Sequence, residues 1–251
     1  MTAPLLLEVE NVTKSFGGLN AIDSASITLR SGKLHAIIGP NGAGKTTLFN
    51  VISGTLKATS GRIKFLGRDI TNEPVHRISR LGLARTLQIK SVFPELTVRE
   101  NLWIAAQSRD GVFKPFVRAI NLHLTNEKVD ELCLELGLME LANHKAANLS
   151  YGDIALLEIG LALATNPKLL LLDEPVCGMG PAETEKTVAK IQDLAKNIDI
   201  IIIEHDMEVI FSIADNIIVM AQGRVLAKGT SKEISNNADV RFAYLGDAND
   251  D

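Results

Sequence analysis

The segment Gly39-Pro40-Asn41-Gly42-Ala43-Gly44-Lys45-Thr46-Thr47 matches the phosphate-binding pattern GxxxxGK[ST] in full. The apolar run 34–38 precedes it and predicts a buried strand, and the run 45–53 predicts a helix. In this setting the backbone N–H groups of the loop and the helix N-terminus form a cradle for phosphate oxygens. We expect Lys45 to reach the β- and γ-phosphates of a nucleotide and the Thr46 hydroxyl to bind Mg²⁺. The alternative, a chance match in a glycine-containing turn, is disfavoured because strand, loop and helix occur together.

Composition predicts a soluble cytosolic protein of 251 residues, with an apolar fraction of 46% that is enough for a sizeable core. The net charge of −4 does not suggest a nucleic-acid partner. The longest apolar runs, 169–172 and 200–203, are far shorter than the roughly 18 residues of a membrane span. Cys133 and Cys177 stand far apart and read as reduced thiols, and the scattered histidines predict no structural metal.

The order of predicted elements indicates an α/β fold. After residue 153, apolar strands alternate with helices, which predicts a mainly parallel sheet with helices on its faces. The stretch 90–150 carries helices only and is a candidate subdomain inserted into one domain that spans 1–251. The expected strands are 5–12, 24–30, 61–67, 168–173, 199–204, 215–221 and 224–228. The expected later helices are 97–108, 118–137, one that starts near Asp153 and runs over 154–165, 182–196 and 206–213.

A second constellation consists of four leucines, 169–172, that end in Asp173 and Glu174. A buried strand would deliver these two acids at its carboxyl end, where α/β sheets bind their ligands. Neighbouring side chains on a strand point to opposite sides, so two roles are natural. Asp173 could complete the Mg²⁺ shell, and Glu174 could polarise the water that attacks the γ-phosphate. A strand that merely ends in a solvated acidic turn is the alternative.

The segment Asn148-Leu149-Ser150-Tyr151-Gly152-Asp153 resembles the signature motif, usually written LSGGQ, of ATP-binding-cassette (ABC) proteins. The resemblance runs from about residue 6 to 246. It implies a P-loop NTPase core with an N-terminal antiparallel β subdomain and an inserted α-helical subdomain that ends in the signature. The segments Glu204-His205-Asp206-Met207 and Ala243-Tyr244-Leu245-Gly246 are similar to the ATPases of branched-chain amino-acid importers, with urea and short-chain amide importers as close relatives.

The resemblance assigns three further residues to the ATP site. Phe16 matches the aromatic residue that stacks on adenine, although an ordinary half-exposed core phenylalanine would look the same. Gln88 matches the glutamine that contacts Mg²⁺ and the attacking water, an assignment that depends wholly on the resemblance. His205 matches the histidine that contacts the γ-phosphate and holds Glu174 and water, whereas a lone histidine after a strand is usually a turn residue.

Ser150 and Gly152 imply a dimer. In ABC proteins the signature of one subunit closes over the ATP held by the P-loop of the other, which gives a head-to-tail pair with two ATPs. A simple Ser N-cap would fit the same residue without excluding that role. The family further implies transmembrane permease subunits, an extracytoplasmic substrate-binding protein as an indirect partner, and a peripheral position on the cytoplasmic face of the membrane. Residues 92–94, Val-Phe-Pro, offer apolar contacts for a permease helix.

The sequence departs from the family at three places. Tyr151 and Asp153 replace the usual Gly and Gln of the signature. The segment 154–157 lacks the usual polar and basic residues, and Gly160-Leu161 stands where Ala-Arg is usual. Gly180 replaces an Asp or Asn that normally crosses the dimer interface. These departures bear on dimer closure and hydrolysis rate, and the last two also resemble urea importers.

The sequence as a whole predicts an ATP-hydrolysing subunit of a membrane importer, for branched-chain or other amino acids. A urea or short-chain amide importer is the alternative substrate assignment. Two other classes stay open, a non-transport ABC protein and a binding-only regulatory subunit that has lost hydrolysis. A single cassette without a heptad run argues against the first, and the intact Lys45, Asp173, Glu174 and His205 argue against the second.

Overall fold

The computed structural model describes residues 3–86, 92–107 and 123–245. Its centre is a mainly parallel sheet whose strand order is β10-β9-β3-β8-β7-β6. All neighbouring strands in it pair in parallel except β10, which runs antiparallel to β9. The strands are β3 Leu34–Ile38, β6 Leu83–Arg85, β7 Leu169–Asp173, β8 Asp199–Ile203, β9 Asn216–Ala221 and β10 Arg224–Gly229.

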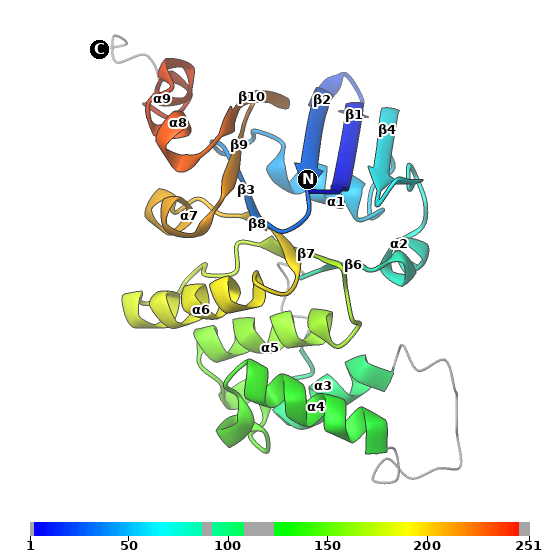
Figure 1. Cartoon of the computed structure of the whole chain (residues 1–251), viewed down its shortest axis with the longest axis vertical. Coiled ribbons are helices and arrows are strands. Elements are labelled where there is room, and N and C mark those ends of the chain that lie inside the picture. The colour runs from blue at the N-terminus through cyan, green and yellow to red at the C-terminus, as the bar shows by residue number, and fades with distance from the viewer. Residues whose placement is uncertain (1–2, 87–91, 108–122, 246–251) are drawn as a thin grey trace.

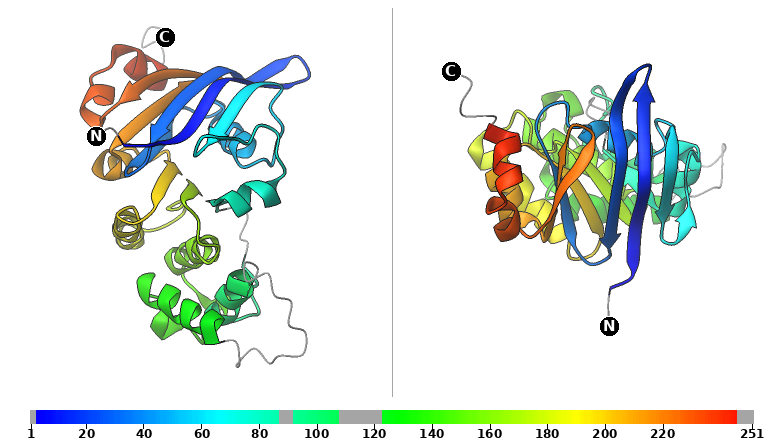
Figure 2. Two further views of the ribbon diagram at one scale, coloured as in Figure 1. Left: turned by 45° about the vertical axis from the view of Figure 1, so that its right-hand side comes forward. Right: turned by 90° about the horizontal axis from the view of Figure 1, so that it is seen from above.

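A second, antiparallel sheet has the order β2-β1-β4-β5. Figure 2 shows β1, β2 and β4 on the side of the molecule away from α3 and α4. Val9 of β1 pairs with Ile27 of β2 and with Ile63 of β4. The long β1–β2 ribbon extends beyond the expected strand 5–12, because the polar residues after Val12 continue to pair with β2. The strands are β1 Leu5–Phe16, β2 Leu19–Arg30, β4 Ser60–Phe65 and β5 Arg68–Asp69.

Helices cover the sheet and extend below it in Figure 1. The expected helix 118–137 is described from His123 onward, since residues 108–122 lie outside the described ranges. None of the helices among the described residues is both long enough and apolar enough to cross a membrane. The helices are α1 Lys45–Ile52, α2 Val75–Leu81, α3 Val98–Gln107, α4 His123–Glu135, α5 Tyr151–Leu163, α6 Pro181–Leu194, α7 Met207–Ile213, α8 Ser231–Ser235 and α9 Ala238–Leu245.

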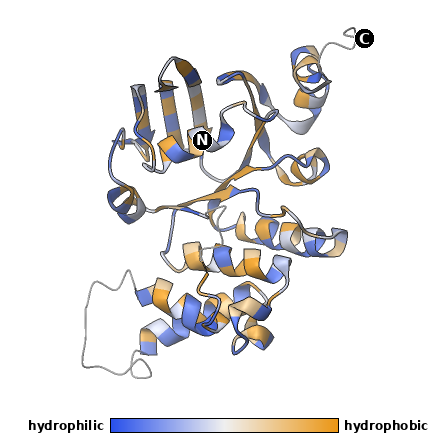
Figure 3. Cartoon of the chain, turned by 180° about the vertical axis from the view of Figure 1, so that it is seen from behind, coloured by the Kyte–Doolittle hydropathy of each residue, from blue (hydrophilic) through white to orange (hydrophobic). Residues whose placement is uncertain are grey.

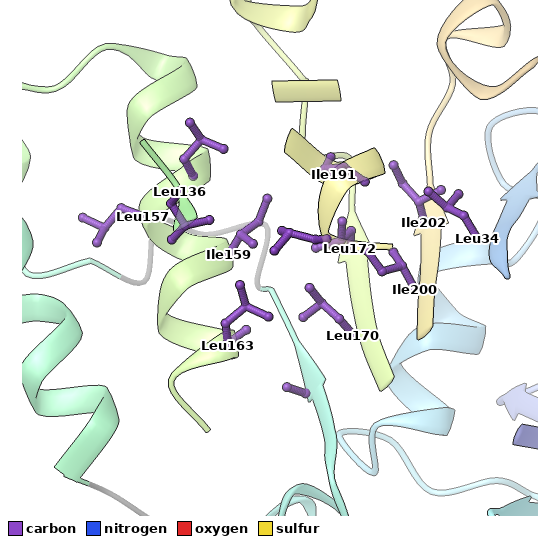
Figure 4. Packing of buried hydrophobic residues seen from close by; sticks show 14 of the residues in the cluster. Leu34, Leu136, Leu157, Ile159, Leu163, Leu170, Leu172, Ile191, Ile200 and Ile202 are labelled. Atoms are coloured by element: carbon purple, nitrogen blue, oxygen red, sulfur yellow. The ribbon is translucent and has the colours of Figure 1, made fainter. Parts of the chain in front are cut away.

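The alternation of side chains along β7 divides the core into two clusters. Leu170 and Leu172 face α5 and α6, whereas Leu169 and Leu171 face the antiparallel sheet and α1. Figure 4 shows Leu170 and Leu172 between Ile159 and the isoleucines of β8. Both faces of this strand are fully buried, as the unbroken leucine run predicts. Figure 3 shows hydrophobic residues dominating the central strands, whereas the outlying helices mix both kinds.

Gly160 of α5 lies in close contact with side chains from the neighbouring helical segments. A Cβ at this position would lie 2.6 Å from Leu136 Cδ1 and 2.8 Å from Leu102 Cδ2. Both leucines are fully buried, so a larger residue requires the packing of α3 and the end of α4 to shift. The departure from the usual alanine therefore has a local packing reason. The fold class is confirmed, with a parallel core, an N-terminal antiparallel sheet and a helical region.

Candidate nucleotide site

Three adjacent strands deliver the predicted site residues to one edge of the main sheet. Parallel pairing places Ile37 of β3 and Asp173 of β7 on either side of Ile203 of β8. The loop 39–44 follows β3, Glu174 follows β7, and His205 lies just beyond β8. The carboxyl edge of a parallel sheet is where α/β proteins bind ligands. The order of strands, which the sequence does not show directly, thus brings the separate motifs together.

The loop 39–44 is wedged between other backbone segments. Gly39 and Gly44 have φ of +154° and +96°, values at which residues other than glycine are strained. A Cβ on Gly39 would collide with the carbonyl of Met220, and one on Gly44 with the carbonyl of Ala21. Gly44 is also the N-cap of α1, so the loop passes directly into a helix N-terminus. The remaining predicted loop residues comprise exposed Asn41 and Gly42, buried Ala43, and partly buried Pro40, Thr46 and Thr47.

Lys45 is buried and folds back over the loop. Its Nζ donates to the carbonyl oxygens of Gly39, at 2.7 Å, and Pro40, at 3.1 Å. Burial lowers the pKa of the Lys45 amine, and the nearby carboxylates of Glu174 and Asp173 act in the opposite direction. The ammonium group therefore lies against the first two residues of the loop. The carboxylates of Asp173 and Glu174 are close enough to influence its pKa.

The two carboxylate oxygens of Asp173 have different surroundings. Its Oδ2 lies 2.7 Å from Arg85 Nη2, whereas Oδ1 is buried and has no hydrogen-bond partner among the described residues. An orphaned buried oxygen is costly unless something else contacts it. A carboxylate oxygen and a hydroxyl such as that of Thr46 are the hard oxygen ligands that Mg²⁺ prefers. Asp173 and Thr46 therefore fit a Mg²⁺ ion whose remaining ligands are phosphate oxygens. Such a site does not need a cluster of protein carboxylates.

Glu174 begins a tight turn at the end of β7. Its φ is +52°, an unusual value for a residue that is not glycine. Its N–H donates to the carbonyl of Ile203 at 2.9 Å, which continues the pairing with β8 past the strand. Such strained positions cluster at functional sites.

Glu204 connects His205 to the loop after Glu174, a role that the sequence does not reveal. Its side chain is fully buried; Oε1 accepts the N–H of Val176 at 3.0 Å and Oε2 accepts the N–H of His205 at 3.2 Å. Burial raises the pKa of the Glu204 carboxyl. The His205 ring is 61% exposed, with Nδ1 3.6 Å from Glu204 Oε2. An acid between an apolar strand and a histidine is the only sequence signal of this link.

Ser150 and Gly152 lie at the start of α5, which begins at Tyr151 rather than near Asp153. Ser150 is its N-cap: Oγ accepts the N–H of Asp153 at 3.2 Å and donates to Asp153 Oδ2 at 2.9 Å. The N–H of Gly152 points to Glu183 Oε1 of α6 at 3.4 Å. The hydrogen bonds of the described residues connect neither Ser150 nor Gly152 to the loop 39–44.

A cavity of about 330 Å³ separates α5 from the end of β7. Tyr151, Glu158 and Ile159 line it from α5, and Asp173 and Glu174 line it from the strand side. The start of the signature helix and the two acids thus border the same space within one chain.

Phe16, at the end of β1, is exposed by 49%. Lys14 Nζ lies 4.9 Å from the centre of its ring, so one face of the ring already contacts a cation. A half-exposed ring is compatible both with adenine stacking and with an ordinary half-exposed phenylalanine, so the stacking role stays a prediction. Gln88 lies outside the described residues.

Comparison with known proteins identifies the family. Residues 22–177 match the family described as ABC transporter. The chain belongs to the ABC transporter family. The cassette is 41% identical to the high-affinity branched-chain amino acid transport ATP-binding protein LivG of Salmonella typhimurium, over 99% of this chain and 100% of the relative. It is 40% identical to BraF of Pseudomonas aeruginosa, which has the same description, over the same shares.

A solved structure supports the same assignment. The cassette resembles a nucleotide-free ATP-binding cassette from an ABC transporter with a TM-score of 0.86 and 35% identity, over 96% of this chain and 99% of the other. The cassette is therefore an ATP hydrolase of the ABC type, and ATP is its nucleotide.

Proposed function

We propose that this cassette is the ATP-hydrolysing subunit of a membrane importer for branched-chain amino acids. The observation that carries the proposal is the sequence identity of 40–41% to transport ATP-binding proteins of that class, over nearly the whole of both chains. The site is compatible with it, because the loop 39–44, Asp173, Glu174 and His205 converge at one edge of the sheet.

Each site residue has a distinct task in the proposed mechanism. The loop N–H groups and Lys45 bind the phosphates, and Phe16 stacks on adenine. Thr46, Asp173 and Gln88 would hold Mg²⁺, which when bound neutralises phosphate charge. Glu174 takes a proton from the attacking water as it approaches the γ-phosphate, and His205 holds Glu174 and the water in line. Glu204 holds the backbone N–H groups of Val176, two residues after Glu174, and of His205.

Two copies of the cassette, or this cassette and a homologue, form the proposed head-to-tail dimer. Ser150 and Gly152 of one subunit contact the γ-phosphate bound by the other, where a hydroxyl, an N–H group and a helix N-terminus make an anion site. ATP binding closes the dimer, and hydrolysis with phosphate release reopens it. The energy of closure is thereby used to switch the transporter between its two access states.

The permease subunits are the proposed membrane partners. Residues 92–94 offer them an apolar contact, and Phe93 is 54% exposed. Substrate would arrive from a binding protein on the outer side, so the cassette would sit on the cytoplasmic face of the membrane.

Reconstitution tests the proposal directly. The cassette is co-purified with the permeases that neighbouring genes encode, placed in liposomes, and assayed for ATP hydrolysis with the cognate binding protein. We expect leucine, isoleucine or valine to stimulate hydrolysis and to accumulate in the vesicles. Stimulation by urea or a short-chain amide instead would support the alternative that Gly180 and the segment 154–157 favour. Hydrolysis that no permease affects would contradict an importer.

A further inference from the structure

We propose that Arg85 and Thr86 are positioning residues that clamp Asp173 so that one of its carboxylate oxygens is kept for the metal ion of the nucleotide. The inference rests on the proposed function, since it takes Asp173 as the metal-binding carboxylate. Arg85 is the last residue of the short strand β6, which pairs with β7. Thr86 follows it and is still hydrogen-bonded to β7.

The carboxylate of Asp173 is held by one oxygen only. Arg85 Nη2 donates to Asp173 Oδ2 at 2.7 Å, and the two side chains are 9% and 0% exposed. Oδ1 has no hydrogen-bond partner in the described part of the chain, although it is equally buried. A guanidinium group could engage both oxygens of a carboxylate, but here Nη2 engages one. The arrangement thus leaves a fixed acceptor.

The guanidinium group is itself fixed from the opposite side by α1. Arg85 Nη1 donates to Asn50 Oδ1 at 2.7 Å and to Ser53 Oγ at 3.3 Å. The ring of Phe49 lies 5.6 Å from the guanidinium carbon, at a distance where cation–π attraction acts. Arg85 therefore bridges the helix that follows the phosphate loop and the strand that carries Asp173.

Thr86 holds the backbone of the same aspartate. Its Oγ1 accepts the N–H of Asp173 at 3.3 Å. Its own N–H donates to the carbonyl of Leu171 at 3.0 Å, which extends the β6–β7 pairing by one residue. The side chain and the main chain of Asp173 are thus restrained by two consecutive residues.

A clamp would keep Asp173 from turning toward a second cation at the same edge of the sheet. Lys45 Nζ is held there by the carbonyl oxygens of Gly39 and Pro40, in the loop after β3, which lies across β8 from the strand that carries Asp173. A rotation of Asp173 toward that ammonium would remove an oxygen ligand from the metal. A buried ion pair contributes little net stability compared with apolar side chains of the same size. We therefore assign the Arg85–Asp173 pair to the orientation of Asp173 rather than to the stability of the fold.

The test measures metal affinity apart from turnover. Mn²⁺, which electron paramagnetic resonance detects, is titrated into the cassette with a non-hydrolysable ATP analogue. We expect Arg85→Met to weaken Mn²⁺ binding about tenfold or more, the range typical of groups behind metal ligands. Thr86→Val should weaken it less, because Thr86 holds the main chain of Asp173 and not its carboxylate. Analogue affinity in EDTA, measured by calorimetry, should change by less than about twofold, since the clamp acts on the metal ligand.

Matched controls separate the possible outcomes. Arg224→Met breaks a surface Arg–Asp pair, Arg224 Nη2 to Asp23 Oδ2 at 2.6 Å, and should leave Mn²⁺ affinity unchanged. Asp173→Asn reports on the proposed function: if it does not weaken Mn²⁺ binding, Asp173 is not the metal carboxylate. If Asp173→Asn weakens binding while Arg85→Met and Thr86→Val do not, the clamp is wrong.

Two further outcomes decide the proposal. Tighter Mn²⁺ binding by Arg85→Met would show that Arg85 competes with the metal, which overturns the clamp. If Arg85→Met fails to fold, Asn50→Ala replaces it, because this variant removes the shorter of the two hydrogen bonds to Arg85 Nη1 and keeps the ion pair. We expect Asn50→Ala and Thr86→Val each to weaken Mn²⁺ binding, and wild-type affinity in both would refute the inference.

Discussion

Replacement of Gly180 by aspartate tests whether a missing carboxylate weakens the proposed dimer. Gly180 precedes α6 with φ −75° and ψ 165°, an extended conformation that any residue adopts without strain. A Cβ at this position meets nothing within 4 Å. The steric objection to a side chain, which a positive φ would have raised, therefore does not apply, and the substitution changes only what the side chain adds.

The magnitude follows from two separate contributions. Within one subunit, a non-glycine residue in a compatible conformation stabilises the fold by about 0.4–1 kcal/mol, and aspartate at the N-cap adds a few tenths. Glu183, whose Oε2 lies 3.5 Å from the N–H of Gly180, reduces this gain by repulsion. Across the dimer, one hydrogen bond per subunit contributes about 1 kcal/mol. Two such bonds make about 2 kcal/mol, or roughly thirtyfold in the dissociation constant.

The assay compares dimer dissociation constants by sedimentation with ATP, in the Glu174→Gln background. Gly180→Ala is the matched control, because it supplies the backbone effect without a carboxylate. We expect Gly180→Asp to tighten the dimer and Gly180→Ala to leave it unchanged. Equal tightening by both variants, or no tightening by aspartate, would refute a missing cross-interface contact.

Three further substitutions test the site and the fold. Glu174→Gln should bind ATP, lose most turnover and accumulate as an ATP-bound dimer in size-exclusion chromatography; turnover at the wild-type rate would remove Glu174 from catalysis. Lys45→Ala should weaken ATP binding more than adenosine binding in calorimetry, because it removes a charge-assisted phosphate contact, and equal ATP affinity would contradict the loop assignment. Burial lowers the pKa of His35 below its ordinary value of 6.5. The native state therefore disfavours the protonated ring, so stability is fully present above pH 6.5 and falls as the pH drops through the lowered pKa. In His35→Gln the free energy of unfolding should lose this part of its pH dependence, and parallel curves for both proteins between pH 5 and 8 would contradict it.

The sequence predicted local structure correctly where a continuous apolar run or a complete motif was present. The leucine run of β7 and the phosphate loop have the strand and the strand–loop–helix context that were predicted. The pattern missed α2, β5, β6, α8 and α9, all of them short. β6 has only three residues, too few for alternation to appear, and its pairing with β7 is what makes it a strand.

Side-chain contacts between residues far apart in the chain could not be predicted from the sequence. Arg85 and Asp173 are 88 positions apart, and nothing in either motif indicates that they pair. The role of Glu204 likewise depends on Val176, 28 positions away and on the neighbouring strand's loop. Burial decides both cases, because a charged group enclosed by the core must find partners wherever the topology places them.

Residues assigned to phosphate already have partners within the chain, so nucleotide binding is an exchange of contacts. Lys45 would leave the carbonyl oxygens of Gly39 and Pro40 for phosphate oxygens. The N–H of Gly152, which points to the Glu183 carboxylate, would leave one anion for another when the proposed dimer closes. A hydrogen bond gained in such an exchange contributes only its excess over the bond that is lost. The affinity lost in Lys45→Ala therefore measures how much better phosphate satisfies the ammonium than two neutral carbonyls do, and the charge on phosphate is what makes that difference favourable.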